Sequence, residues 1–260
     1  MEIFVCIKQV PDTTEIKIDP ESNTLIREGV ESIINPFDLY AIEEALRLKK
    51  EYGGKVTAVS MGPPQVESAL REAVSMGVDK IYLISDRKFA GADTWATSLT
   101  LAAAVEKIEA ADLILFGQQA IDGDTAQVGP GVAAHMDIPQ TCFVRKIEKI
   151  EDQTITVERL METGYDRIKM NLPAVITVVK EINTPRLPSL RGKRKARKAE
   201  LNILTADDLD LNEEEVGLNG SPTEVIKIFS PKIKKKKKKH KHEPDEAAKV
   251  IYEKLKEITN

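Results

Sequence analysis

The sequence predicts an α/β fold built on a doubly wound parallel sheet, and three observations lead to this prediction. Short apolar runs alternate with longer segments of helical periodicity over residues 1–140, which favours parallel strands with a helix after each one. After residue 140, apolar and polar residues alternate, as in half-exposed antiparallel strands. The chain of 260 residues is also long enough to bury one sizeable core.

The first 140 residues predict four strands and four helices. The strands are the short apolar runs, at 3–7, 55–61, 80–84 and 113–116. The helices have apolar residues three or four positions apart, at 36–52, 65–76, 93–108 and 125–135. Asn35 and Asp93 are expected to cap two of these helices, and Pro36 suits a first helical position. Residues 16–18 and 24–26 suggest a small hairpin.

The segments 142–150, 154–160 and 166–172 predict a small antiparallel addition to the parallel sheet, because apolar and polar residues alternate along each of them. The apolar run 174–179 then predicts a strand that returns to the core.

An arm at residues 182–200 follows that last strand. Pro185 and Pro188 argue against a helix and against a central strand, and 191–198 holds six basic residues in eight positions. We therefore expect an extended, exposed arm that another protein holds.

The chain thus divides into a core domain at 1–181, the arm at 182–200 and a C-terminal extension at 201–260. The extension contains an acidic stretch, a lysine-rich run at 232–241 and a short amphipathic helix at 245–258. We expect the lysine-rich run to be disordered when free.

Composition excludes several classes of protein. No run of about 18 apolar residues could span a membrane, and no signal peptide is recognisable, so a cytoplasmic protein is expected. Cys6 and Cys142 lie in apolar runs and are read as buried, without a disulfide. The net charge is −4, with 14 of the 38 basic residues in 191–198 and the lysine-rich run. No aromatic residues interleave that run, so we expect contact with an acidic partner and not with nucleic acid.

The carboxyl ends of three predicted strands carry candidate binding residues. These strand ends are 6–9, 61–63 and 117–128, and parallel sheets bind ligands at such ends. The helix expected after Ala126 offers backbone N–H groups that suit a phosphate. The alternative is that the glycines merely close tight turns. No GxGxxG, Walker motif, catalytic triad or metal cluster is present.

Five segments in order resemble the beta subunit of electron transfer flavoproteins. The resemblance covers residues 1–205 and is carried by VCIKQV at 5–10, INPF at 34–37, VSMGP at 59–63, GQQAIDGD at 117–124 and LPAVITV followed by NTPRLPSL at 172–190. It implies a Rossmann-like domain of the adenine-nucleotide-binding type that pairs with an alpha subunit carrying FAD. The beta subunit itself holds either AMP, or a second FAD that accepts hydride from NADH.

The segment DGDTAQVGP at 122–130 resembles the FAD-binding, electron-bifurcating branch of that family. The small residues Gly123, Ala126 and Val128 leave room for a pyrophosphate, and Asp124 and Thr125 could hydrogen-bond to FAD. The resemblance implies that further residues line the adenosine end of the cofactor: Cys6, Asn35, Met61, Ala120 and Gln127. No catalytic side chain is implied.

In the arm, Leu190 matches the residue that anchors family members in a pocket of a partner dehydrogenase. Lys195 and Lys198 match lysines of the family's basic patch.

The resemblance therefore implies a bifurcating subunit. Electrons from NADH would go to ferredoxin or flavodoxin and, through the alpha-subunit FAD, to a flavin-dependent dehydrogenase of the acyl-CoA, enoyl-CoA or 2-hydroxy acid type. One alternative is a non-bifurcating carrier with structural AMP. Another is a nucleotide-binding adaptor whose basic arm holds an acidic partner.

Overall fold

The computed structural model describes residues 1–12, 32–226 and 241–259. The chain forms two units, Met1–Ile226 and Lys227–Asn260. The expected hairpin at 16–18 and 24–26 and nearly all of the lysine-rich run lie outside the described residues. In the second unit, the expected amphipathic helix is α6, Pro244–Thr259.

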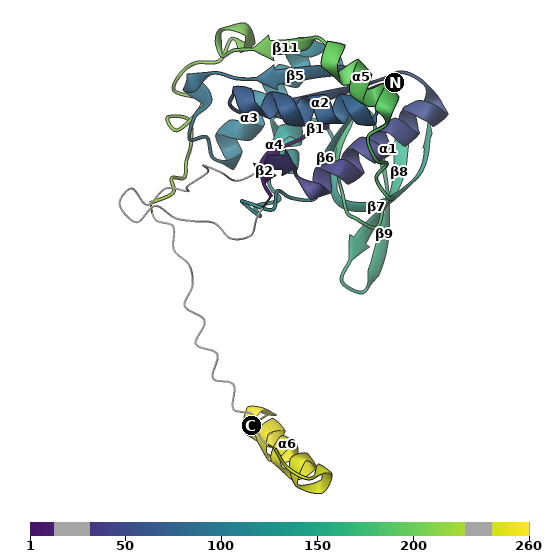
Figure 1. Cartoon of the computed structure of the whole chain (residues 1–260), viewed down its shortest axis with the longest axis vertical. Coiled ribbons are helices and arrows are strands. Elements are labelled where there is room, and N and C mark those ends of the chain that lie inside the picture. Colours follow the sequence, from purple (N-terminus) through teal and green to yellow (C-terminus); the bar gives the residue numbers. More distant parts are fainter. Residues whose placement is uncertain (13–31, 227–240, 260) are drawn as a thin grey trace. The chain divides into compact units, whose positions relative to one another are not determined.

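The first unit is an α/β domain around a nine-stranded sheet in the order β11-β5-β4-β1-β6-β10-β7-β8-β9, which confirms the predicted fold class (Figure 1). From β11 to β7 the neighbouring strands pair in parallel. The bounds of these strands are β1 Glu2–Cys6, β4 Lys55–Met61, β5 Lys80–Ile84, β6 Leu113–Gly117, β7 Gln140–Glu151, β10 Ala174–Val178 and β11 Leu201–Leu204.

The antiparallel part is an extension of the same sheet. β8 (Thr154–Met161) pairs antiparallel with β7 and with β9 (Gly164–Asn171), as the alternating sequence predicts. A separate ribbon joins β2 (Gln9–Pro11) to β3 (Ser32–Ile34).

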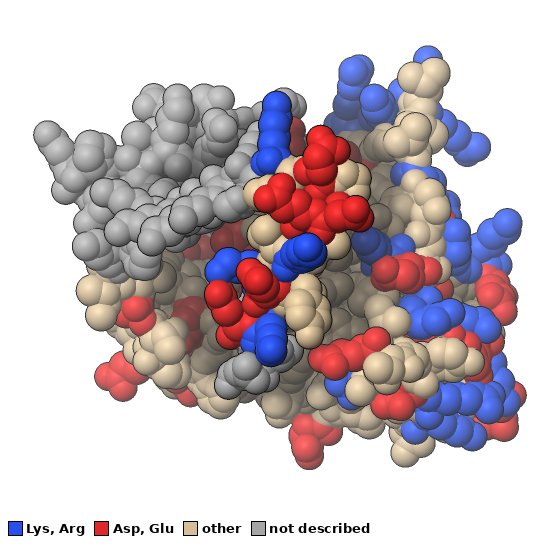
Figure 2. Space-filling view, turned by 90° about the horizontal axis from the view of Figure 1, so that it is seen from below, with Lys and Arg blue, Asp and Glu red and all other residues tan. Residues whose placement is uncertain are grey.

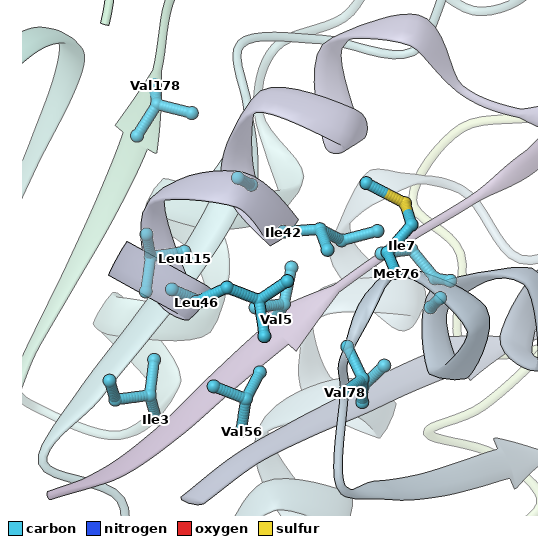
Figure 3. Packing of buried hydrophobic residues seen from close by; sticks show 14 of the residues in the cluster. Ile3, Val5, Ile7, Ile42, Leu46, Val56, Met76, Val78, Leu115 and Val178 are labelled. Carbon is cyan, nitrogen blue, oxygen red and sulfur yellow. The ribbon is translucent and has the colours of Figure 1, made fainter. Parts of the chain in front are cut away.

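Helices cover both faces of the sheet because successive core residues of a strand point to opposite sides. Ile3 and Val5 of β1 face α1 (Pro36–Tyr52) and α2 (Glu67–Met76), and Figure 3 shows this layer with Ile42 and Leu46 of α1. Phe4 faces the opposite layer, formed by α3 (Thr94–Ile108) and α4 (Val128–His135). Short 3-10 turns complete the domain: Pro64–Val66, Arg87–Phe89 and Asp207–Leu209.

We expected the whole arm to be extended, but part of it is helical. It is irregular as far as Ser189, and then forms helix α5, Leu190–Lys198. Pro185 and Pro188 precede the helix and so remove none of its hydrogen bonds, while the Ser189 side chain caps it by accepting from the Gly192 N–H at 2.9 Å. α5 lies along α2 (Figure 1).

Beyond the arm, β11 at Leu201–Leu204 adds to the edge of the sheet by pairing with β5. No strand was expected in the C-terminal extension, because four residues are too few for a clear periodic signal.

The described surface carries both signs of charge. Figure 2 shows Lys and Arg side chains interleaved with Asp and Glu side chains on the face in view. Among the described residues, no helix is long and apolar enough to cross a membrane.

Candidate functional site

The central strands create a topological switch point at the carboxyl edge of the sheet. Strand β1 lies between β4 and β6 in the sheet. The chain passes from β1 to β4 through α1, which covers one face of the sheet. It later reaches β6 through α3, which covers the opposite face. Ligands of doubly wound sheets bind outside the strand ends at such a point. We call Cys6, Asn35, Asp38, Gly117 and residues 118–127 the carboxyl-edge site.

Asn35 joins the start of α1 to the segment after β6. Its Nδ2 donates to the Gln119 carbonyl oxygen at 2.8 Å, and its Oδ1 accepts from the Ile121 N–H at 3.1 Å. Asn35 occupies the N-cap position of α1, with Pro36 next to it as predicted, but its side chain makes no capping hydrogen bond. The expectation that this amide caps the helix is therefore wrong, because its donors and acceptor are used by the neighbouring loop.

Asp38 is a buried carboxyl group in the first turn of α1. Its Oδ2 accepts from the Lys8 N–H at 2.7 Å and its Oδ1 accepts from Asn35 Nδ2 at 3.0 Å, and the Gly117 N–H is a third donor. Burial raises the pKa of Asp38 to about 7, although these hydrogen bonds act in the opposite direction. The carboxyl group thus lies where β1, β6 and α1 meet.

The segment 118–127 is the exposed wall of the site. Asp124 and Ala126 have positive φ values of 51° and 54°, and Gln119 Nε2 donates to Asp124 Oδ1 at 2.8 Å. A Cβ atom added to Gly123 would meet no atom within 4 Å. The loop is therefore held at a few points and open at Gly123.

Backbone donors gather at the end of this segment, just before α4. Within the described part of the chain, the N–H groups of Thr125, Ala126 and Gln127 donate to no protein acceptor. Successive free N–H groups near left-handed residues form an anion-binding concavity, and a helix N-terminus adds a favourable dipole. A phosphate or pyrophosphate is the kind of group that such donors can hold.

A salt bridge spans the site from β1 to the loop after β6. Lys8 Nζ lies 2.7 Å and 2.8 Å from the two carboxylate oxygens of Asp122. Both side chains are partly exposed, so the pair contributes little stability but ties the two strand ends together.

The structure brings the sequence-predicted cofactor residues to one edge of the sheet. Cys6 and Met61 end the neighbouring strands β1 and β4, and Ala120, Gly123, Asp124, Thr125, Ala126, Gln127 and Val128 follow β6. Cys6 is buried and free, and burial raises the pKa of its thiol, with Asp38 acting in the same direction. Cys142 is only half-buried, because it lies at the start of the partly exposed β7.

The predicted partner-binding residues lie elsewhere, on the arm. The Leu190 side chain is 83% exposed at the start of α5. Lys195 is also exposed, but its Nζ donates to the Val78 carbonyl oxygen at 3.2 Å, and Lys198 is exposed at the end of the helix. The start of α5 contacts Ser75 near the end of α2, which places it toward the edge opposite the carboxyl-edge site.

Two acidic residues of α1 hold the root of the arm. Arg186 Nε lies 2.6 Å from Glu43 Oε2 and its Nη2 lies 3.1 Å from Oε1, while Asn183 Nδ2 donates to Glu44 at 2.9 Å. Burial alone would raise the pKa of Glu43, but the Arg186 hydrogen bonds outweigh burial and lower it. Arg71 of α2 donates to the Ala196 and Ala199 carbonyl oxygens at the end of α5.

The sequence did not single out Asp38, and it gave no individual role to three other polar residues of the predicted strand ends: Lys8, Gln119 and Asp122. An aspartate in a first helical turn is ordinarily explained by the helix dipole, and only the tertiary fold shows that Asp38 is buried. The described residues contain no cluster of His, Cys, Asp and Glu suited to a metal ion.

Comparisons with known proteins place these features in a family. A model described as "Electron transfer flavoprotein domain" matches residues 22–209, a span that includes Asn35, the 118–127 segment and the arm. The electron transfer flavoprotein subunit beta of Thermoanaerobacterium thermosaccharolyticum is 52% identical over 256 residues, covering 98% of each chain.

Two further relatives have more specific names. The subunit CarD of the caffeyl-CoA reductase-Etf complex of Acetobacterium woodii is 52% identical over 235 residues, which are 90% of this chain and 89% of that protein. Protein FixA of Azotobacter vinelandii is 46% identical over 243 residues, which are 91% and 86% of the two chains.

Proposed function

The chain belongs to the electron transfer flavoprotein family as a beta subunit, and from this premise we propose that it binds FAD at the carboxyl-edge site and works in electron bifurcation. Beta subunits of this family act in electron transfer and pair with an alpha subunit. The named relative CarD, a subunit of a caffeyl-CoA reductase-Etf complex, supports a role beside a flavin-dependent dehydrogenase.

One observation favours FAD over AMP as the bound nucleotide. Thr125, Ala126 and Gln127 present three successive N–H groups without a protein acceptor among the described residues, and the space beside Gly123 is open. A pyrophosphate that leads on to a riboflavin needs both the donors and the room, whereas AMP needs only a phosphate subsite. The residues present therefore fit the longer nucleotide.

The proposed roles divide between the cofactor and the protein. Bound FAD would supply the redox chemistry, taking hydride equivalents from NADH and passing electrons singly to ferredoxin or flavodoxin and to the alpha-subunit FAD. The chain's own residues place the cofactor: Asn35 fixes the loop, and the donors at 125–127 hold the pyrophosphate. Cys6, Met61 and Ala120 would line the adenosine end, and Asp124 and Val128 the pyrophosphate.

The arm is the proposed contact with the dehydrogenase, of the acyl-CoA, enoyl-CoA or 2-hydroxy acid type. Leu190 would be the apolar anchor, because an exposed leucine on a fixed helix start can enter a pocket at little entropic cost. Lys195 and Lys198 would face acidic residues of that partner. We place this complex in the cytoplasm.

Cofactor content tests the proposal. The chain is co-expressed with its alpha subunit, the purified complex is denatured, and released nucleotides are separated and quantified. We expect two FAD per heterodimer and no AMP. One FAD and one AMP would contradict the bifurcating role, and a stable lone chain that holds no flavin would favour the nucleotide-binding adaptor.

A variant sharpens this test at Gly123. Gly123→Asp places a carboxylate in the open space beside the proposed pyrophosphate, so the second FAD should be lost or replaced by AMP. Gly123→Ala is the matched control, because a methyl group meets no neighbour, and it should keep two FAD. Full FAD occupancy in Gly123→Asp would contradict the assigned pyrophosphate position.

A further inference from the structure

We infer that Asp38 is a positioning residue whose carboxyl group sets the geometry of the carboxyl-edge site through Asn35 and the first residues after β1 and β6. The inference rests on the proposal that an adenine nucleotide binds there. Asp38 itself is only 6% exposed. It would therefore act through the segment 118–127 and not by contacting the ligand.

The carboxyl group joins three chain segments that are distant in sequence. It accepts from the Lys8 N–H just after β1, from the Asn35 side chain at the start of α1, and from the Gly117 N–H at the end of β6. Hydrogen bonds to a charged acceptor are stronger than those between neutral groups. Asp38 therefore fixes the relative position of the two strands that flank the switch point.

The contact between Gly117 and Asp38 requires a residue without a side chain at position 117. A Cβ atom at that position would lie 2.6 Å from the Phe37 carbonyl carbon and against Asp38 Oδ1. The absence of a side chain lets the end of β6 approach α1 closely enough for its N–H to reach the carboxyl group.

Asn35 transmits the arrangement to the loop. One hydrogen of its Nδ2 goes to Asp38 Oδ1 and the other to the Gln119 carbonyl oxygen, while its Oδ1 accepts from the Ile121 N–H. Asp38 thus determines which way the amide faces, since a carboxylate accepts only. If Asp38 presented a donor instead, the amide would rotate and release residues 119–121.

The ionised form of Asp38 is the one that this arrangement satisfies, because all three described partners are donors. Protonation would introduce a hydrogen among them and loosen Asn35. Burial raises the pKa of Asp38 to about 7, so the change falls in the neutral range. The other ionisable groups that face it are Cys6 on β1, and Lys8 with its partner Asp122 on the loop.

The test measures FAD binding to the full-length chain by calorimetry. Asp38→Asn keeps the shape of the side chain but replaces one acceptor with a donor, and we expect FAD affinity at pH 8 to fall at least tenfold. Glu44→Gln is the matched control: it is the same change at another buried acid of α1, which contacts the arm and not the site, and affinity should stay within twofold.

A double-mutant cycle separates positioning from general damage to the fold. Asn35→Ala should weaken FAD binding by itself. If Asp38 acts through Asn35, Asp38→Asn should cost less than threefold further in the Asn35→Ala background. Multiplicative losses, or an Asp38→Asn affinity within twofold of wild type, would overturn the inference.

The pH dependence of FAD affinity can be measured on the wild-type chain, so this test does not depend on a variant that folds. Wild-type FAD affinity should rise severalfold from pH 6 to pH 8 as Asp38 ionises, and a flat wild-type profile would overturn the inference. In Asp38→Asn, which keeps Cys6, Lys8 and Asp122, this rise should disappear. Failure of the wild-type chain to bind either FAD or AMP would instead overturn the proposed function, and this inference with it.

Discussion

The carboxyl-edge site and the arm are both irregular segments that follow a buried strand, and both are held by carboxyl groups of α1. Asp38, in the first turn, holds the segment after β6 through uncharged donors. Glu43, further along the helix, holds the arm through the Arg186 guanidinium. The same helix thus supports two regions with different partners.

The difference in partners reverses the effect of pH on stability. The pKa of Asp38 is raised to about 7, so the folded chain binds more protons than the unfolded chain between about pH 4 and 7, and Asp38 lowers the stability as pH rises. The pKa of Glu43 is lowered, so its contribution is present above the ordinary glutamate range and is lost as pH falls. The stability change linked to Asp38 is therefore expected up to neutral pH, and the change linked to Glu43 only at acidic pH.

The largest effect is expected from breaking the site at Gly117. In Gly117→Ala the new methyl group would overlap Phe37 and Asp38, and we expect the free energy of unfolding to fall by about 3 kcal/mol. Urea unfolding followed by circular dichroism measures it. Gly123→Ala, in the open part of the same segment, should stay within about 0.5 kcal/mol; equal losses in both variants would contradict the close-packed account of the strand end.

A smaller effect is expected from Arg186→Ala, which removes the arm's charged clamp. Two guanidinium hydrogen bonds to Glu43 are lost, and because Arg186 is partly exposed we expect about 1–2 kcal/mol. Glu43 would then keep Arg47, whose Nε lies 3.1 Å from its Oε1, but it would lose the stronger Arg186 contacts, so its pKa should rise from its lowered value. The stability difference from wild type should therefore widen as pH rises from about 4 to about 6.

Urea unfolding at several pH values follows this change, and amide hydrogen exchange of the arm locates it. Arg191→Ala, an exposed arginine of the same arm, is the control and should leave stability unchanged. A difference that stays constant with pH would show that Arg186 does not determine the ionisation of Glu43.

The smallest effect on stability is expected from Leu190→Ala, because the side chain is 83% exposed. The free energy of unfolding should stay within about 0.5 kcal/mol, while electron delivery to the dehydrogenase weakens and bound nucleotide stays intact. Ile203→Ala on β11, also exposed, is the control for delivery. Equal delivery by wild type and Leu190→Ala would exclude Leu190 as the anchor.

The sequence predicted the strands of the parallel and antiparallel parts of the sheet, apart from β11, because each of them carries its own local signal. Asp93 also behaves as predicted: its carboxylate caps α3 by accepting from the Trp95 and Ala96 N–H groups. Such features depend on neighbours within one helical turn, which a sequence pattern can reveal.

Features that depend on distant partners were missed. Asn35 is a residue type that commonly caps helices, but its amide hydrogen-bonds to the backbone of residues 119 and 121, more than 80 positions away. Helix α5 has a capping serine, yet its basic residues gave no apolar stripe, because the contacts that hold it are backbone carbonyls bound by Arg71. Local periodicity does not reveal partners of this kind.

The position of β11 has a consequence for synthesis of the chain. This strand pairs with β5, and Asn202 Nδ2 reaches the Ile81 carbonyl oxygen across 121 residues of sequence. While the chain is still emerging from the ribosome, the outer side of β5 stays unpaired until Leu204 has left the exit tunnel. Long-range pairing of this kind slows folding and leaves a strand edge open to other chains. The arm, translated just before β11, is the last segment made before that edge is covered.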